Sequence, residues 1–158
     1  KSDLVLLTGG VSVGDYDYVT KAAEACGIST RFHRIKQRPG KPLYFGTIDE
    51  KIVIGLPGNP SSALTCFYMY VLPVMSRMMH IPVACKEGRA TLTNSFEKSK
   101  GLTQFVKARL ELAEVTILHA QESFRLHSFA TANCLAELDE DKELFLPGEA
   151  VKVHLLPS

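Results

Sequence analysis

Two stretches of this sequence place small and rigid residues directly after apolar runs, a pattern typical of phosphate-binding loops. In the first, TGGVSVGDYDY, the small residues are Gly9, Gly10, Ser12 and Gly14. A glycine-rich turn between a strand and a helix exposes backbone N–H groups at the positive end of the helix dipole, where a phosphate binds. The GxGxxG spacing of dinucleotide sites and the Gly-Lys-Ser/Thr of a Walker A loop are both absent. A plain tight turn therefore stays open as the alternative.

Two acidic residues, Asp15 and Asp17, stand at the exit of this loop. Their carboxylates would repel a phosphate unless a cation lies between them, and a carboxylate beside a phosphate is a common way to hold Mg²⁺. The alternative is that one of them only caps the following helix. With two acids, one can cap while the other faces the ligand.

The second stretch, GLPGNPSSA, repeats the pattern of strand, rigid loop and helix start. Its loop residues are Pro57, Gly58, Asn59, Pro60 and Ser61. Between the two stretches lies RPGKP, whose prolines can aim Lys41 at a fixed point, although an exposed basic turn is the simpler interpretation. Two strand-to-helix loops at one edge of an α/β sheet form a crevice beyond the strand ends. Together with the basic turn, they favour a phosphorylated ligand.

The elements that must position these loops follow from the apolar pattern. Leu4 to Leu7 predicts a strand buried on both faces of a parallel sheet. A helix capped by Asp15 or Asp17 follows, ends at Gly27, and presents one apolar face made of Val19, Ala22, Ala23 and Cys26. A strand over residues 29–35 would complete a strand–helix–strand unit.

The next segments predict a hairpin and a long helix. RIKQRPGKP is expected to be a polar turn, and residues 43–45 and 52–54 are the two short strands of the hairpin. Ser61 or Ser62 is expected to cap an apolar helix over residues 63–79, which Pro73 kinks or splits. From Arg89 onward, alternating segments at roughly ten-residue spacing predict a small all-β sandwich or barrel. The boundary is expected near residues 81–88.

Composition excludes several classes of function. The 158 residues carry 18 basic and 17 acidic side chains, so the net charge of +1 gives no nucleic-acid footprint. No apolar stretch reaches the roughly 20 residues that span a membrane, and a cytoplasmic location is expected. The chain begins without Met, which suggests a piece of a larger protein.

The cysteines and histidines show no metal-ligand spacing. The cysteines are Cys26, Cys66, Cys85 and Cys134. The histidines are His33, His80, His119, His127 and His154. We expect the cysteines to be free, buried thiols in a reducing compartment rather than disulfides.

The stretches TGGVSVGDYDYV, RPGKPLYFG and GLPGNPSSALTCF together resemble the MoeA family of molybdenum-insertion proteins, whose animal counterpart is the gephyrin E domain. QESFRLHSFATANCLAEL and LFLPGEAVKVHLL look like the closing β domain of that family, more loosely. The resemblance implies that residues 1–82 are the C-terminal part of a MogA-like, three-layer α/β molybdopterin-binding domain. Residues 83–158 would form a small C-terminal β-barrel or sandwich.

The resemblance also implies an activity. Proteins of this family take adenylylated molybdopterin and molybdate and, in a Mg²⁺-dependent reaction, release AMP and form the molybdenum cofactor. Asp17 and Lys41 match catalytic positions, and Asp17, with Asp15 ranked behind it, would hold Mg²⁺. The matched substrate-binding positions are Gly9, Gly10, Ser12, Gly14, Pro57, Gly58, Asn59, Pro60, Ser61, Lys107, Arg109 and Ser123. A homodimer of the longer protein and an adenylyltransferase partner are further implications.

Two departures from the family matter. Its members are longer and supply further strands and acids, some across a dimer interface, so this chain alone is expected not to turn over. Lys107 stands where arginine is usual, and an ammonium cannot replace a bidentate guanidinium without loss. The alternatives left open are an adenylyltransferase-like or other α/β binding module, a gephyrin-like scaffold that binds receptor loops, and a purely structural β module.

Overall fold

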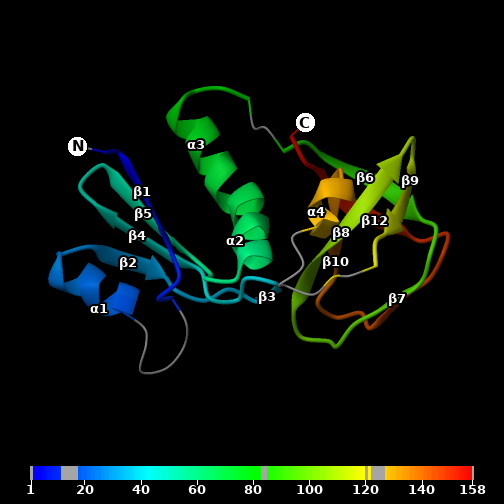
Figure 1. The fold of residues 1–158 in the computed structure, drawn as a ribbon, viewed down its shortest axis with the longest axis horizontal. Coiled ribbons are helices and arrows are strands. Elements are labelled where there is room, and N and C mark those ends of the chain that lie inside the picture. The colour runs from blue at the N-terminus through cyan, green and yellow to red at the C-terminus, as the bar shows by residue number, and fades with distance from the viewer. Residues whose placement is uncertain (1, 12–17, 83–84, 120, 122–126, 158) are drawn as a thin grey trace.

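The computed structural model describes residues 2–11, 18–82, 85–119, 121 and 127–157. In this part of the chain, a four-stranded sheet with helices on both faces is followed by a closed β-barrel (Figure 1). This confirms the predicted fold class, an α/β unit followed by an all-β unit. No helix in the described part of the chain is long and apolar enough to cross a membrane.

The four-stranded sheet has the strand order β1-β5-β4-β2. Its members are β1 (Leu4–Thr8), β2 (Ser29–Phe32), β4 (Tyr44–Ile48) and β5 (Lys51–Leu56). β1 runs parallel to β5, whereas β4 pairs antiparallel with both β5 and β2. The β4–β5 pair is the predicted hairpin, and Asp49 takes a positive φ of 49° in its turn.

One sequence prediction about this sheet is wrong. β1 is an edge strand rather than a strand buried on both faces, and Val5, Leu6 and Leu7 are 36–39% exposed. An apolar run does not reveal whether a strand has one neighbour or two. The predicted strand–helix–strand unit is present, since β1, α1 and β2 follow one another and both strands belong to this sheet, with β5 and β4 between them.

The first helix, α1 (Tyr18–Ala25), packs on one face of the sheet through Val19 and Ala23. Gly27, at φ +71°, ends it as predicted. The N–H groups of Gly27 and Ile28 bond back to the carbonyls of Glu24 and Ala23, which is the Schellman arrangement. The buried face of α1 is narrower than predicted, because Ala22 and Cys26 are exposed.

The predicted long helix is continuous but not uniformly α-helical. It consists of α2 (Pro60–Cys66), a π-helical segment η1 (Phe67–Val71) and α3 (Leu72–Met78). Of the two effects predicted for Pro73, a kink or a split, the split is therefore wrong. The Leu72 N–H bonds to the Phe67 carbonyl five residues back, and this wider turn accommodates a proline that cannot donate to an α-helical ladder.

The start of this helix also differs from the prediction. Asn59, rather than Ser61 or Ser62, is the N-cap residue, and Pro60 is the first helical residue. Proline is favoured there because its missing N–H would have no intrahelical partner. The two serines consequently lie inside the first turn, where both are buried.

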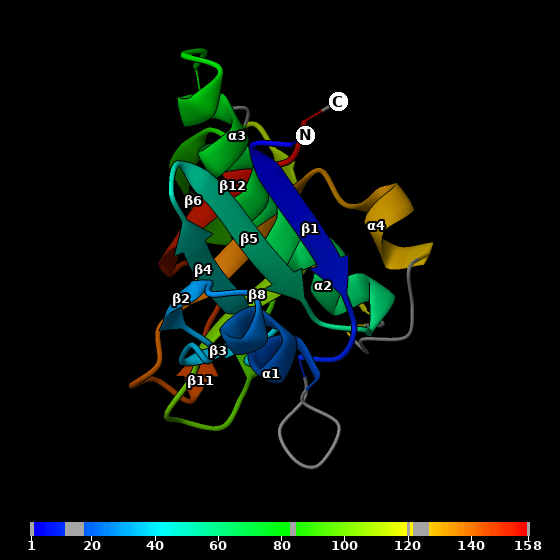
Figure 2. The ribbon, with the colours of Figure 1, turned by 90° about the vertical axis from the view of Figure 1, so that its left-hand side faces the viewer.

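The two helical layers bury opposite faces of the sheet (Figure 2). On the α1 side the core contains Val11, Val19, Ala23, Tyr44 and Val53. On the α2–α3 side it contains Leu43, Ile54, Leu56, Cys66 and Val71. The strand alternation of β5 thus serves both cores, which explains why its run is almost wholly apolar.

The second unit is a barrel. Its strands are β6 (Glu87–Leu92), β8 (Thr103–Glu111), β9 (Glu114–Ile117), β10 (Cys134–Leu138) and β12 (Ala150–Leu155). The pairing of β10 with β8 closes it, so the predicted alternation becomes an interior of side chains such as Leu92, Val106 and Val115. A ribbon of β7 (Phe96–Glu97) and β11 (Leu144–Phe145) packs on this core. A short helix, α4 (His127–Thr131), precedes β10.

One strand joins the two units. β3 (Gln37–Arg38) lies in the stretch expected to be a polar turn, yet it runs parallel along β8 in the barrel sheet. Gln37 stands opposite Thr103, and Arg38 stands opposite Gln104. The division at residues 82 and 83 stays a prediction.

The burial of the cysteines can be compared with the prediction made from the sequence. Cys66, Cys85 and Cys134 are free and buried as expected, whereas Cys26 is exposed, contrary to the prediction. Burial raises the pKa of all three buried thiols, to about 12 for Cys66 and about 11 for Cys134. Burial keeps reagents away from these thiols, and the raised pKa lowers the fraction of the reactive thiolate, so both effects slow their reaction.

We therefore expect brief alkylation of the native chain at pH 8 to label Cys26 first. Peptide mass spectrometry should find the label on Cys26 at least tenfold ahead of the other three cysteines. In denaturant all four should react at similar rates, which is the control. Labelling of native Cys66 at the rate of Cys26 would contradict the packing of α2 on the sheet.

Candidate functional site

A cavity of about 690 Å³ lies where the turn after β3 meets the barrel. One wall is the turn at residues 38–42, and the other comes from residues 96–105 of the barrel. Polar side chains from both units line it: Arg38, Lys41, Ser62, Glu97, Gln104 and Gln121. Residues of both units thus line the cavity, at the place where β3 pairs with β8.

The turn itself is held closely against the long helix. The Arg38–Pro39 peptide bond is cis, and Gly40 takes a φ of +89°. A Cβ on Gly40 would lie only 2.3 Å from the Cys66 sulfur, so no side chain fits there. At the end of the turn the Lys41 carbonyl accepts a hydrogen bond of 3.0 Å from the Ile35 N–H. The backbone of Lys41 is thereby fixed.

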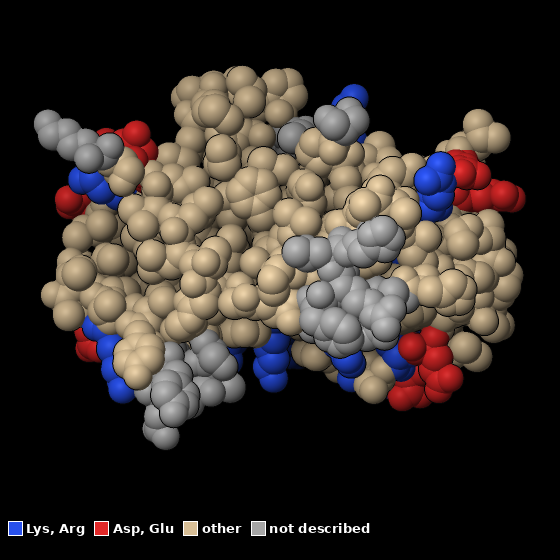
Figure 3. All heavy atoms as spheres, in the orientation of Figure 1, with Lys and Arg blue, Asp and Glu red and all other residues tan. Residues whose placement is uncertain are grey.

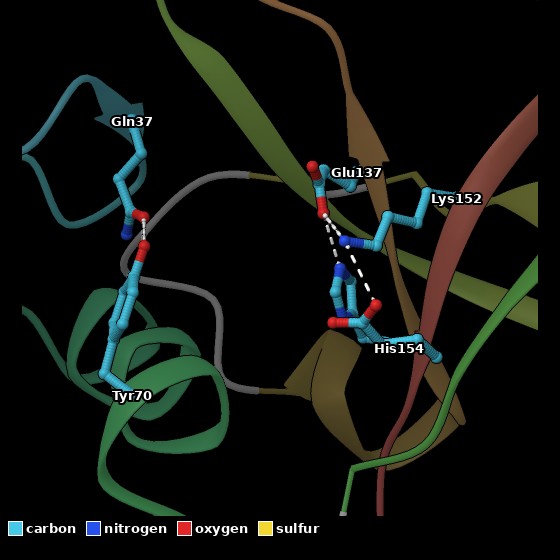
Figure 4. A network of polar contacts seen from close by, with 6 residues as sticks. Gln37, Tyr70, Glu137, Lys152 and His154 are labelled. Atoms are coloured by element: carbon cyan, nitrogen blue, oxygen red, sulfur yellow. Dashed lines mark hydrogen bonds and ion pairs between the residues drawn. The ribbon is translucent and has the colours of Figure 1, made fainter. Parts of the chain in front are cut away.

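Gln37 is the buried polar residue that anchors this turn. Its side-chain Nε2 donates to the Pro39 carbonyl at 2.9 Å and lies 3.6 Å from the Cys66 sulfur. Its Oε1 accepts a hydrogen bond from the Tyr70 hydroxyl, which rises toward it from the helix (Figure 4). Both ends of the carboxamide are thus engaged, as a buried amide requires.

The Tyr70 phenol and the Cys66 thiol, on the helix side of this network, stay protonated at neutral pH. Burial raises the pKa of the Tyr70 phenol to about 12, and the neighbouring acidic groups of Cys66 and Glu137 add to the shift. Burial likewise raises the pKa of Cys66 to about 12. Tyr70 consequently remains a hydrogen-bond donor at neutral pH.

The cations of the cavity wall fall into two groups. Lys98 is 7% exposed, and its ammonium donates to the carbonyls of Ser99, Leu102 and Glu140. Within the described residues, by contrast, no hydrogen bond or ion pair engages the side chain of Arg38 or Lys41. Basic side chains emerge near the place of β3 along the lower margin of the face in Figure 3. This wall is therefore suited to an anion.

The two glycine-bearing loops meet at the ends of β1 and β5. The Gly9 N–H donates to the Leu56 carbonyl at 3.0 Å, and Gly9 has a φ of +81°. A Cβ on Gly58 would stand 3.3 Å from the Gly9 Cα, so the two backbones pack against each other. This contact accounts for both glycines structurally. Binding of a phosphate by Gly9, Gly10 and Gly58 stays a prediction.

A buried lysine connects the second loop to the barrel. Lys107 of β8 is 4% exposed, and its ammonium lies 3.5 Å from the Ser61 hydroxyl and 5.5 Å above the Phe129 ring. Its backbone N–H and C=O are both bonded to the side chain of Gln121, which lines the cavity. Arg109, two residues on, is exposed and pairs with Glu111 at 2.8 Å, outside the cavity lining.

The structure thus brings part of the predicted site together. Lys41 lines the cavity, Lys107 contacts Ser61, and Gly9 contacts Gly58. Pro57 is buried behind this contact, while Asn59 and Pro60 begin the helix. The predicted residues that lie outside the described part of the chain are Ser12, Gly14, Asp15, Asp17 and Ser123.

Sequence reasoning missed Gln37, Ser62 and Tyr70. Ser62 follows a predicted site residue and could have been included on that ground. No local pattern marks Gln37 or Tyr70, because their roles arise from the pairing of β3 with β8 and from the packing of the long helix. Arg38, noted in the sequence only as a cation of the basic turn, lines the cavity.

A second polar cluster lies on the barrel, and it is closed on itself (Figure 4). The His154 Nε2 lies 2.6 Å from a Glu137 carboxylate oxygen, and the Lys152 ammonium bridges Glu137 and Glu87 at 3.4 and 3.2 Å. Burial opposes the charge on Lys152, but the two carboxylates raise its pKa overall. These groups satisfy one another and tie β6, β10 and β12 together.

No group of three or more metal-binding side chains occurs among the described residues. Glu97 is the one carboxylate among the described side chains that line the cavity. The side chains around the cavity are mainly cations and hydrogen-bond donors, which are the groups that suit an anion. Fold and site together define a protein with an α/β unit followed by a β-barrel, and a cavity with basic side chains on its wall lies where the two meet.

Comparison with known proteins assigns this arrangement to a family. Residues 1–77 match the family described as "Probable molybdopterin binding domain", and residues 89–156 match "MoeA C-terminal region (domain IV)". The chain belongs to the MoeA family, which confirms the resemblance found in its motifs.

Named relatives agree with this assignment. The molybdopterin molybdenumtransferase of Staphylococcus aureus strain COL is 33% identical over 163 residues, which cover 100% of this chain and 39% of the relative. That of Staphylococcus epidermidis is 33% identical over 161 residues, or 38% of its length. A solved MoeA protein from Pyrococcus horikoshii aligns over 98% of this chain and 37% of its own, with a TM-score of 0.79 and 30% identity. The chain thus spans about two fifths of these relatives.

The close contact at Gly40 gives a stability prediction. Gly40→Ala should lower the free energy of unfolding by about 3 kcal/mol, because the new methyl meets Cys66 and the positive φ is strained for alanine. Gly148 has the same φ of +89° but nothing within 4 Å of a Cβ. Gly148→Ala should therefore cost only about 1 kcal/mol. Equal losses in urea unfolding would show that the turn is not packed against the helix.

Proposed function

We propose that this chain forms the substrate-binding core of a molybdopterin molybdenumtransferase. The substrates would be adenylylated molybdopterin and molybdate, and the products would be AMP and the molybdenum cofactor. The observation that carries the proposal is the cavity between the two units, with Arg38 and Lys41 on its wall. The activity named for the staphylococcal relatives supports it, as does the order of the two matched family regions.

The described residues can perform the electrostatic part of such a reaction. Both substrates are anions, and cleavage of a phosphoanhydride places further charge on its oxygens. Arg38 offers a planar fork of donors, while Lys41 offers a compact charge on a fixed backbone. Ser62 of the long helix and Gln104 of the barrel wall add uncharged donors to the cavity. Preorganised donors of this kind stabilise charge that develops during a reaction.

Mg²⁺ is part of the proposal on sequence grounds alone. Asp17, with Asp15 beside it, would hold the ion next to the glycine-rich loop, and both lie outside the described residues. The described residues do not provide a ligand set of their own. The chemistry proposed for them is therefore charge neutralisation, with no step through the metal.

Further parts of the proposal concern the longer protein. We place it in the cytoplasm as a homodimer that receives its pterin substrate from an adenylyltransferase. The 158-residue chain would bind substrates without turning them over. An adenylyltransferase-like module is the less favoured alternative, because the barrel supplies one wall of the cavity and matches the MoeA C-terminal region.

The first test is anion binding by the 158-residue chain. Isothermal titration with molybdate and, separately, with AMP should show which anion the cavity takes. Lys41→Met should weaken binding of that anion by at least tenfold, since a charged hydrogen bond contributes about 1.5–3 kcal/mol. Lys51→Met, on the exposed start of β5, is the matched control and should leave the affinity unchanged. Equal affinities of the Lys41 and Lys51 variants, or no binding of either anion, would refute the proposed function of the cavity.

A further inference from the structure

We propose that Gln37 and Tyr70 are positioning residues that lock the turn at residues 38–41 into its ligand-binding shape. Gln37 borders the cavity and Tyr70 does not, but the role proposed for the pair requires no contact of either side chain with the ligand. Their hydrogen bond would fix the turn to the barrel and to the long helix at once, and so set the affinity of the cavity. The proposal rests on the proposed function of this cavity as an anion site.

Gln37 lies where the turn, the barrel and the long helix meet. Its backbone belongs to β3, whose pairing places it opposite Thr103 of the barrel strand β8. Its side chain reaches the opposite way, to Tyr70 in the π-helical segment of the long helix. The residue is only 2% exposed. One buried side chain therefore connects the barrel, the helix and the turn.

The carboxamide of Gln37 bonds both the turn and the long helix. Its Nε2 donates to the Pro39 carbonyl at 2.9 Å, inside the turn, and its Oε1 accepts from Tyr70. The Tyr70 bond orients the amide, since it decides which end is acceptor and which is donor. Removing the Tyr70 hydroxyl leaves Gln37 free to rotate its amide. Removing the amide leaves the Pro39 carbonyl and the Tyr70 hydroxyl without this partner.

Other described side chains contribute little hydrogen bonding to the turn. The Cys66 thiol lies 3.8 Å from the Gly40 carbonyl, which is a long contact, and the Lys41 carbonyl is bonded to Ile35 at the far end. Pro39 and Pro42 can donate no backbone hydrogen bond. Gln37 thus provides the shortest described side-chain bond to the turn. Loss of this bond should raise the ordering cost of binding an anion at Arg38 and Lys41.

The test compares Gln37→Met and Tyr70→Phe with the control Tyr44→Phe. Tyr44 is also a buried tyrosine, but its hydroxyl bonds Thr30 at 3.1 Å, away from the turn. Amide ¹⁵N relaxation of Gly40 and Lys41 reports the order of the turn without any ligand. Both Gln37→Met and Tyr70→Phe should lower the order parameters of these two amides, while Tyr44→Phe should leave them at wild-type values.

Anion affinity is the second measurement. With the anion that binds the wild-type chain, Gln37→Met and Tyr70→Phe should weaken binding by about three- to tenfold, the range of one net hydrogen bond. The double variant should bind no more weakly than Gln37→Met alone, because both changes remove the same lock. Thermal unfolding, followed by circular dichroism, checks that each variant is folded.

The outcomes separate this proposal from the function on which it rests. If neither molybdate nor AMP binds the wild-type chain, the proposed function fails, and the order parameters alone decide whether the lock exists. If the Lys41 variant loses affinity while a folded Gln37→Met keeps both wild-type affinity and an ordered Lys41 amide, the positioning role is refuted. Additive losses in the double variant would also refute it.

Discussion

The pairing of β3 with β8 is the interaction on which the candidate site depends. Two residues of a turn-rich segment lie in the sheet of a barrel whose own strands begin some fifty residues later. This pairing places the basic turn against the barrel and creates the cavity between them. Gln37 and Arg38 are neighbours in β3 and both border the cavity, but Gln37 is buried and bonded to Tyr70, whereas Arg38 is exposed. Alternation along the strand thus gives the two side chains different surroundings.

The cations near the cavity differ in burial and in the partners that they have within the protein. Lys98 and Lys107 are buried cations, and each is held by groups of the protein: three carbonyls for Lys98, and a hydroxyl and an aromatic ring for Lys107. A buried charge must be compensated in this way. Arg38 and Lys41 have no such described partner and face the cavity. They are the cations left to meet an anionic ligand.

Much of the fold could be predicted from the sequence. The hairpin, the glycine that ends α1, the long helix and the alternating strands of the barrel all follow from local periodicity and turn residues. Membership of the MoeA family could be recognised from three short motifs. The exposure of β1 and the position of β2 in the sheet could not be predicted, because local patterns do not specify the order of strands.

The site was predicted less completely, for a physical reason. Lys41, Ser61 and Lys107 carry recognisable chemistry, and the structure places them around the junction of the two units. Gln37 and Tyr70 act through a contact between residues 33 positions apart, which no spacing rule indicates. The structure adds a packing reason for glycine at positions 9 and 58, since the two backbones lie against each other.

The central claim is that the cavity between the turn and the barrel binds the anion. The most direct measurement is anomalous diffraction at the molybdenum edge from crystals of the 158-residue chain grown with molybdate. The account predicts a molybdenum peak within hydrogen-bonding reach of Lys41 or Arg38, and its loss in crystals of Lys41→Met. A molybdenum peak bound elsewhere on the chain, or one that persists unchanged in the variant, would contradict it.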